Sequence, residues 1–260
     1  MNNTNKKFDI IKKQICYEVN KIYQSIKHKK IYYKNKGNLA IDPVSYFDLS
    51  IEKKIRKIII KEFPNHSIIG EELKPSLNNS KYKWYIDPID GTKSFIMGLP
   101  NWSNLVGLYY NSTPIFSMAY FPVLEKLYFT KGNQNYLQTK DGTKRIHANK
   151  KVKTNDVAIA FNTFRSIKEK KIFSKLLNFK FLFKITGVDS LNFCLLTEGK
   201  IDFLIEKGLK PVDYLPLMKL IKNSGAVMTD WKGKNKYPKG DVIVASNKTI
   251  YNYFYRKLFL

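Results

Sequence analysis

The segment Trp-Tyr-Ile-Asp-Pro-Ile-Asp-Gly-Thr, residues 84–92, is the most informative stretch of this 260-residue chain. Residues 84–86 are apolar and predict a short buried strand, which we expect to stop at Asp87, before the proline. Gly91 then lets the chain restart with free backbone N–H groups. Asp87, Asp90 and a backbone carbonyl converge on this turn, and hard cations such as Mg²⁺ prefer oxygen ligands of this kind. The segment favours a metal site, although a capped loop would use the same residue types.

A second acidic motif follows another apolar pair. Glu71 and Glu72 come directly after Gly70, and residues 68–69 are both Ile. Both acidic motifs therefore stand where we expect a strand to deliver its last residue to the edge of a sheet, the usual place for a site in α/β proteins. Acids are scarce in this chain, so their position at two such edges points to a shared site.

The first half of the chain predicts two amphipathic helices and several strands. Apolar residues spaced by three or four along 8–26, and again along 51–63, form one stripe on each helix. Gly, Asn and Pro within 37–43 predict a turn or short hairpin between them. After the acidic segments, we expect further strands at 105–110, 115–121 and 126–130.

Beyond a polar stretch at 131–151, the pattern changes to alternating helices and strands. We expect helices near 165–177, 189–198, 213–223 and 249–258, and strands near 157–161, 201–205, 226–229 and 242–245. The alternation predicts an α/β fold. We expect one catalytic unit over residues 1–260, with a soft boundary near 135–150 between an α+β half and an α/β half.

The charge balance is strongly basic. The chain has 46 Lys and Arg against 21 Asp and Glu, a formal net charge of +25, but four of the basic residues are Arg and the rest are Lys. Nucleic-acid recognition favours the Arg fork, so we interpret the charge as a solvated surface and expect no dedicated nucleic-acid face. Apolar runs such as residues 58–60 are far shorter than the ~20 residues of a membrane span. Two cysteines are too few for a disulfide framework, and we expect a cytoplasmic protein.

Taken together, the acidic motifs resemble the inositol monophosphatase superfamily. They are Gly-Glu-Glu at 70–72, the segment 84–95, and Lys-Pro-Val-Asp at 210–213 ahead of a helix. The resemblance extends over most of the chain and implies a layered α-β-α-β-α sandwich with Mg²⁺-dependent phosphomonoesterase activity. Residues 87–96 and 206–214 resemble the histidinol-phosphate phosphatase branch more than the inositol branch.

Carried over position by position, the resemblance implies two or more Mg²⁺ ions held by acids. Glu71, Asp87 and the Ile89 carbonyl would hold one ion. Asp87, Asp90 and Asp213 would hold a second, so that Asp87 bridges the two. Two such metals can activate a water on one side of a phosphomonoester and stabilise the departing alkoxide on the other.

The resemblance also implies the remaining catalytic groups. Thr92 would orient or deprotonate the attacking water, with Asp48 behind it. The backbone N–H groups of Gly91 and Thr92 would bind phosphate at a helix start. One departure from the family pattern is Ser45, where the family usually has Thr. A hydroxyl is retained there, and we expect Asp48 to keep its role.

Substrate choice depends on acids beyond those that the metals use. Histidinol phosphate carries an ammonium and an imidazole, so its site needs an additional carboxylate. Asp189 and Glu206 are the candidates, and the position of Asp189 resembles an acid of the histidinol-phosphate phosphatases. Helix capping is the alternative role for Asp189. We therefore expect hydrolysis of L-histidinol phosphate, with an inositol-1-phosphatase or a broad sugar-phosphate phosphatase as the alternative.

A basic RNA-binding or regulatory protein on a phosphatase scaffold is the alternative from another class. The complete acid set argues against it, because a scaffold released from catalysis has no physical need for four converging carboxylates. We expect a small phosphomonoester as the partner of this chain, and a homodimer as its assembly.

Overall fold

The computed structural model describes residues 2–35, 43–150, 154, 156–161, 171–172, 174–176, 178–179, 183–185, 187–237 and 239–260. Residues 37–42 of the expected turn lie outside the described residues, as does most of the helix expected at 165–177. Of that helix, residues 171–172 and 174–176 are described and are helical. Within the described ranges, no helix is long and apolar enough to cross a membrane.

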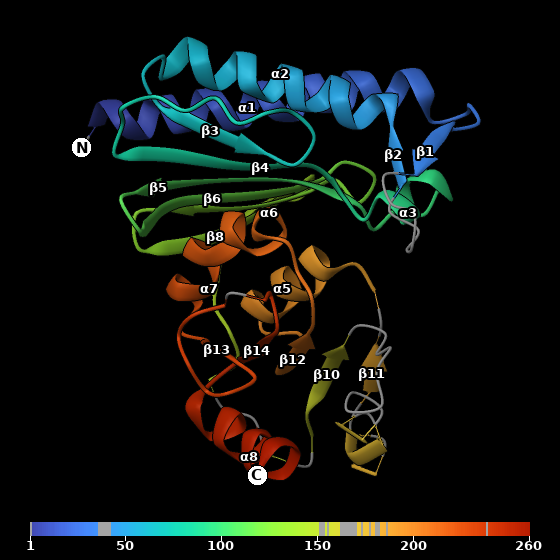
Figure 1. The fold of residues 1–260 in the computed structure, drawn as a ribbon, viewed down its shortest axis with the longest axis vertical. Coiled ribbons are helices and arrows are strands. Elements are labelled where there is room, and N and C mark those ends of the chain that lie inside the picture. Colours follow the sequence, from blue (N-terminus) through green and yellow to red (C-terminus); the bar gives the residue numbers. More distant parts are fainter. Residues whose placement is uncertain are drawn as a thin grey trace.

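Two long helices form the outer layer of the molecule (Figure 1). They are α1 (Asn2–Ile26) and α2 (Tyr46–Glu62), and they confirm the two amphipathic stripes of the sequence. Isoleucines of both helices lie in one buried cluster with Trp84 of the sheet beneath them. The short strands β1 (Tyr33–Asn35) and β2 (Pro43–Ser45) pair antiparallel between the two helices in the chain.

The layer beneath the helix pair is a seven-stranded sheet in the order β3-β4-β5-β6-β7-β8-β9. The strands are β3 (Ser67–Gly70), β4 (Tyr82–Asp90), β5 (Ser103–Tyr110), β6 (Thr113–Phe121), β7 (Lys126–Lys131), β8 (Gln134–Thr139) and β9 (Gly142–Ile146). β3 pairs parallel with β4, and the remaining neighbours are antiparallel. The expected strands at 105–110, 115–121 and 126–130 are confirmed. β8 and β9 lie in the polar stretch where we expected none.

Strand β4 continues beyond the point where the sequence predicted its end. Pairing with β5 stops at Asp87 and resumes at Asp90, which lies opposite Ser103. The register shift between these residues accommodates the proline, which has no N–H for the ladder. The side chain of Asn104 donates to the Pro88 carbonyl within this irregularity. The prediction that the strand ends at Asp87 was therefore wrong, and both aspartates belong to one irregular strand.

The second sheet has five strands in the order β11-β10-β12-β14-β13. They are β10 (Ala158–Phe161), β11 (Phe183–Ile185), β12 (Phe203–Glu206), β13 (Val227–Asp230) and β14 (Val242–Ala245). Four of them confirm expected strands, and β11 was not expected. Helix α8 (Lys248–Phe259) packs against this sheet as the outermost layer of that side (Figure 1).

Short helices fill the space between the two sheets. They are α5 (Asp189–Thr197), α6 (Pro211–Tyr214), the 3₁₀ turn η1 (Leu215–Leu217) and α7 (Met218–Ser224). Helix α3 (Thr92–Ile96) follows β4 and lies beside β2 at the end of the first sheet (Figure 1). The helix expected at 213–223 is thus broken into three pieces, because Pro216 lacks the N–H that a continuous helix needs. The layers follow the order α-β-α-β-α, as expected (Figure 1). The division into halves near 135–150 stays a prediction.

The middle layer packs closely against the first sheet at Gly107. A Cβ built on Gly107 of β5 would lie 2.5 Å from the Cα atom of Pro216 in η1. The backbone of the turn therefore packs directly on the strand, with no side chain between them. This contact helps to set the distance between the sheet that carries Asp87 and the layer that carries Asp213.

Gly107→Ala should destabilise the protein by about 1–3 kcal/mol, because the added methyl group overpacks a backbone contact. The melting temperature should fall by about 2–4 °C per kcal/mol for a chain of this size. Gly187→Ala is the control, since its added Cβ would meet only Asn192 Oδ1, at 3.7 Å. Equal melting temperatures for the two variants would contradict the close packing of these layers.

Candidate active site

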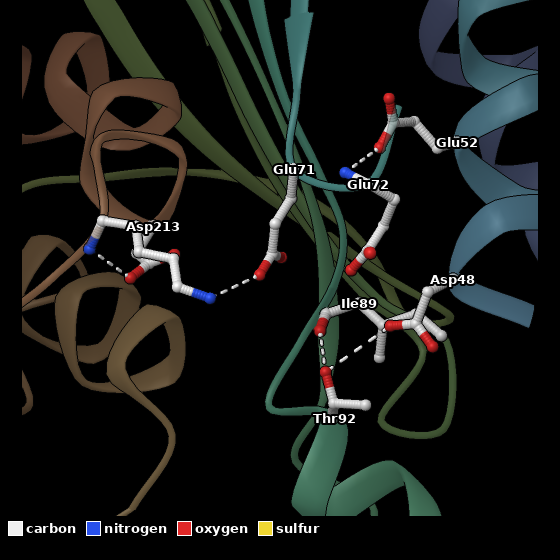
Figure 2. A network of polar contacts seen from close by, with 8 residues as sticks. Asp48, Glu52, Glu71, Glu72, Ile89, Thr92 and Asp213 are labelled. Atoms are coloured by element: carbon white, nitrogen blue, oxygen red, sulfur yellow. Dashed lines mark hydrogen bonds and ion pairs between the residues drawn. The ribbon is translucent and has the colours of Figure 1, made fainter. Parts of the chain in front are cut away.

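Four acids from different elements meet at the end of β4. Asp87 and Asp90 lie on β4, Glu71 directly follows β3, and Asp213 lies on α6 in the middle layer. Figure 2 shows Glu71 facing the helix that carries Asp213, and the dashed line that ends at Glu71 is the hydrogen bond from Lys210 Nζ. The charges of Glu71, Asp90, Asp213 and Asp48 all act on Asp87. The structure therefore brings the predicted acids together.

Asp87 stands at the centre of this cluster. Burial raises the pKa of its carboxyl group well above the usual value, and the neighbouring carboxylates raise it further. Its Oδ1 atom is buried and has no hydrogen-bond partner among the described residues. A buried carboxylate oxygen without a partner is costly, and a hard divalent cation would satisfy it. The donor set at Asp87 therefore fits a divalent metal.

Asp90 is held by the start of α5. The backbone N–H of Ser190 donates to Asp90 Oδ2 at 3.2 Å, and the Ser190 hydroxyl donates to the same oxygen. These hydrogen bonds lower the pKa of Asp90. Burial and the charge of Asp189 outweigh them, so that the pKa rises to about 7. Ser190 thus fixes Asp90 without cancelling the cost of its burial.

Lys210 connects the acids of the two layers. Its backbone N–H donates to Asp213 Oδ2 at 2.7 Å, and its Nζ donates to Glu71 Oε1 at 3.0 Å. Burial, with the charge of Asp90 next, raises the pKa of Asp213 to about 7. The Lys210 ammonium therefore supplies positive charge to Glu71, on the side of the cluster where Figure 2 shows Glu71 facing the middle layer.

In the described part of the chain, the carboxylate groups are not arranged around one common point. In the part of the chain that the structure describes, no three His, Cys, Asp or Glu side chains are grouped as a metal centre. At Glu71, the ammonium of Lys210 occupies one of the two carboxylate oxygens, Oε1. At Ile89, the carbonyl accepts the hydroxyl of Thr92 at 3.0 Å. The two ligand sets implied by the sequence therefore stay predictions, and each would need small side-chain movements.

Thr92 and Asp48 meet as the sequence predicted. Thr92 Oγ1 lies 3.5 Å from Asp48 Oδ1 (Figure 2). Asp48 is fully buried, and its Oδ2 accepts hydrogen bonds from the Ser45 backbone N–H at 2.7 Å and from Ser45 Oγ at 2.6 Å. Ser45 also caps α2. The Ser that replaces the usual Thr of the family therefore supports a complete polar network around Asp48.

Gly91 joins β4 to α3. Its φ of 82° lies in the left-handed region, and a Cβ there would lie 2.8 Å from Val188 Cγ2. Both observations require glycine at this position. Because Gly91 is the N-cap of α3 and has no side chain, no capping side chain covers the first N–H groups of that helix. Such N–H groups are the donors that anion binding at a helix start uses.

A second pair of acids, Asp189 and Glu206, lies beside the first cluster. Burial and the charge of Asp213 raise the pKa of Asp189 to about 7. Burial and the charge of Asp189 raise the pKa of Glu206 well above its usual value. Glu206 Oε1 accepts from Asn192 Nδ2 at 3.4 Å, whereas Oε2 is buried with no partner among the residues described. Two acids beyond the predicted metal ligands therefore border the site.

Sequence reasoning missed three residues that support the acids of this site without being proposed metal ligands or catalytic groups. Lys210 stands within a motif that the sequence analysis quoted for its aspartate alone. Ser190 follows Asp189 directly, and the sequence analysis considered only the aspartate. Glu52 lies within the apolar stripe of α2, four residues after Asp48 and four before Arg56. A charged residue on an otherwise apolar helix face was the available signal, because such a residue is buried with partners or not at all.

The chain is similar in sequence to known proteins. A model of the inositol monophosphatase family matches residues 4–258. The chain is 33% identical over 195 residues to fructose-1,6-bisphosphatase/inositol-1-monophosphatase of Aquifex aeolicus, covering 72% of each protein. It is 30% identical over 236 residues to Nus factor SuhB of Vibrio cholerae, with 88% of this chain and 86% of that protein covered.

Two further comparisons concern the substrate and the fold. The chain is 24% identical over 219 residues to the histidinol-phosphatase of Mycobacterium tuberculosis, with 82% of this chain and 83% of that protein covered. The solved structure of the IMPase of Thermotoga maritima matches with a TM-score of 0.81 at 22% identity, over 95% of this chain and 94% of that chain. The layered fold is therefore that of the solved relative.

The family match implies phosphatase activity. The chain belongs to the inositol monophosphatase family, since the family model spans almost its whole length. The superfamily and the fold class implied by the acidic motifs are thereby confirmed.

The buried acids predict an inverse pH dependence of stability for the metal-free protein. Asp90 and Asp213 have native pKa values near 7, so they hold protons that an unfolded chain loses near pH 4. The free energy of unfolding should therefore fall as the pH rises from about 4 to 7. His66 acts oppositely, because burial lowers its pKa to about 4. The contribution of His66 is the same in the wild type and in Asp90→Asn, so the difference in stability between the two proteins does not contain it.

In EDTA at pH 7.5, Asp90→Asn should melt several degrees above the wild type, and the gain should shrink or vanish at pH 5. Melting curves of the two proteins at both pH values make this measurement. A difference in melting temperature that is the same at pH 5 and pH 7.5 would contradict the raised pKa of Asp90.

Proposed function

We propose that the chain is a cytoplasmic Mg²⁺-dependent phosphomonoesterase that hydrolyses L-histidinol phosphate to L-histidinol and phosphate, a step of histidine biosynthesis. The observation that carries the hydrolytic part is Asp87, whose pKa is raised by the charges of Glu71, Asp90 and Asp213 and whose buried Oδ1 has no hydrogen-bond partner among the described residues. The family match supports the same class of reaction.

The residues present fit Mg²⁺, which takes oxygen ligands. Glu71, Asp87 and the Ile89 carbonyl would hold one ion, and Asp87, Asp90 and Asp213 a second. Bound in this way, the ions would lower the pKa of a water and neutralise charge on the phosphate oxygens. The repulsion among the carboxylates supports this proposal, because cations relieve it.

The other groups of the chain would orient the nucleophile and the phosphate. The Thr92 hydroxyl lies between the Ile89 carbonyl and Asp48, so a water beside it could pass a proton toward the buried Asp48 carboxylate. Ser45 holds Asp48 in place with two hydrogen bonds. The uncapped N–H groups at Gly91 and Thr92 would receive phosphate oxygens.

The choice of substrate rests on Asp189 and Glu206. Histidinol phosphate carries an ammonium group, and the buried Glu206 Oε2, which has no hydrogen-bond partner among the described residues, suits that group. The N-cap of α5 is Val188, so Asp189 is not the capping residue that the alternative interpretation assumed. The histidinol-phosphatase of Mycobacterium tuberculosis is among the relatives, which supports the same choice.

The second candidate is a phosphatase of inositol or sugar phosphates. The Aquifex aeolicus relative has this name and is more similar to the chain than the histidinol-phosphatase, at 33% against 24% identity. Carboxylates also accept hydrogen bonds from sugar hydroxyls, so Asp189 and Glu206 suit a polyol as well. The two candidates share the acid cluster and differ in what these two carboxylates bind. The expected homodimer stays a prediction.

Asp213→Asn should lower kcat by orders of magnitude and raise the Mg²⁺ concentration needed for half-maximal activity, because it removes a ligand charge from the second ion. Phosphate release from histidinol phosphate, measured over a range of Mg²⁺ concentrations, tests this. Circular dichroism of the variant checks that the fold is intact. Full activity of the variant at low Mg²⁺ would exclude the proposed ligand role.

Asp189→Asn separates the two candidate substrates. Loss of a charge-assisted hydrogen bond costs about 1.5–3 kcal/mol, so KM for histidinol phosphate should rise roughly 10- to 150-fold. KM for inositol 1-phosphate or fructose 1,6-bisphosphate should change little. Steady-state kinetics on the three substrates with wild type and variant provide the comparison. Equal losses on all of them would show that Asp189 is structural and would favour the second candidate.

A further inference from the structure

A fully buried glutamate lies behind the loop that carries Glu71. Glu52 of α2 has 0% exposure, and a carboxylate at that depth is costly unless it is paired and hydrogen-bonded. Its first partner is Arg56, one turn later on the same helix, whose Nε donates to Glu52 Oε1 at 2.7 Å. Arg56 is itself buried, with 8% of the residue exposed. The pair is therefore an ion pair built into the interior between α2 and the sheet.

The remaining partners of this ion pair belong to the segment after Glu71. The backbone N–H of Glu72 donates to Glu52 Oε2 at 2.7 Å, as Figure 2 shows, and that of Leu73 donates to Oε1 at 3.3 Å. Arg56 donates from its second terminal nitrogen to the Leu73 carbonyl at 3.2 Å. The ion pair therefore binds the backbone of residues 72–73 through two N–H groups and one carbonyl.

The residue before Glu71 is shaped for this contact. A Cβ built on Gly70 would lie 2.0 Å from Glu52 Oε1, so a glycine is needed for the carboxylate to pass. The φ of Gly70 is not in the left-handed region, so the requirement is space alone. The close approach of Glu52 thus explains why the Gly-Glu-Glu motif begins with glycine.

Glu71 is consequently held from both sides. Its backbone N–H donates to the Ile86 carbonyl of β4 at 3.2 Å, and the residues that follow it are bound by Glu52 and Arg56. The charge of Glu71 raises the pKa of Asp87, so the two carboxylates repel each other. Repulsion of this kind would push a loosely held loop away from the cluster. The contacts from α2 oppose that movement.

From this geometry we infer that Glu52, together with Arg56, is a positioning residue that holds Glu71 at the acid cluster and thereby sets the affinity of the site for its metal. The inference rests on the proposed function, because it takes Glu71 as a metal ligand. It assigns Glu52 no contact with substrate. The consequence is a change in metal affinity when Glu52 is altered, with little change in kcat once the metal is saturating.

Glu52→Gln tests the inference, because it keeps the shape of the side chain but replaces one acceptor oxygen with an NH₂ group. That NH₂ group must then face a donor, either Arg56 or a backbone N–H of residues 72–73, and one hydrogen bond is lost. Titration calorimetry of the EDTA-treated full chain with MgCl₂ should show one binding step weakened about 10- to 100-fold, the usual effect of losing a group that orients a metal ligand. Phosphate release at saturating Mg²⁺ should stay within about threefold of wild type.

Glu18→Gln is the matched control, since Glu18 lies on α1 and pairs with Lys54. It should leave the Mg²⁺ affinity unchanged. Arg56→Lys is the second variant if Glu52→Gln does not fold, because it keeps the charge but loses the hydrogen bond to the Leu73 carbonyl. It should weaken the same binding step.

The outcomes separate this inference from the proposed function. If Glu52→Gln and Arg56→Lys bind Mg²⁺ with the same affinity as the wild type, the ion pair is merely structural, even if both variants melt at lower temperatures. This result would overturn the inference alone. A wild-type chain that binds no Mg²⁺ would overturn the proposed function and the inference with it.

Discussion

Repulsion among buried carboxylates is the constraint on which the rest of this site depends. The chain places Asp87 and Asp90 on one strand and brings Glu71 and Asp213 to them from other elements, so that each carboxylate raises the cost of charging its neighbours. This concentration of acidic residues is unusual in a chain with a net charge of +25. The surrounding residues either fix the acids in place or supply opposite charge.

The supporting contacts come from the two helical layers on either side of the first sheet. Ser190 holds Asp90 from the helices between the sheets, and Lys210 spans from α6 to Glu71. Glu52 and Arg56 hold the Glu71 segment from the outer helix pair. The site therefore exists only when three layers are stacked at the correct distances. A close backbone contact such as that of Gly107 with Pro216 belongs to the same requirement, because it sets one of those distances.

Much of this arrangement could be predicted from the sequence, and the failures have physical causes. The periodic stripes of α1 and α2 are long and were found, as were the acids of the site, because turn-forming residues surround them. β8 was missed because most of its residues are polar and only alternate residues, Asn135 and Leu137, are buried. β9 was missed because its first four residues are exposed and only Ile146 is buried. β4 was expected to end at Asp87, because a proline in a strand is normally a stop and the register shift that accommodates it depends on β5.

Long-range polar contacts were beyond sequence reasoning. Glu52 lies 20 residues from the N–H of Glu72, and Lys210 lies 139 residues from Glu71. Partners at such separations are chosen by the stacking of layers, which local patterns do not encode. One residue of each contact stood out in the sequence: Glu52 as a charge in an apolar stripe, and Lys210 as the first residue of a motif. The residues that they contact could not be predicted.

The central claim is that the acid cluster holds protons until divalent cations replace them. Titration calorimetry of the metal-free chain with MgCl₂, repeated in buffers of different ionisation enthalpy, counts the protons released on binding. The account predicts proton release that grows as the pH is lowered from 8 to 6.5, because Asp87, Asp90 and Asp213 have raised pKa values in the absence of metal. Mg²⁺ binding with no proton release across this range would contradict it.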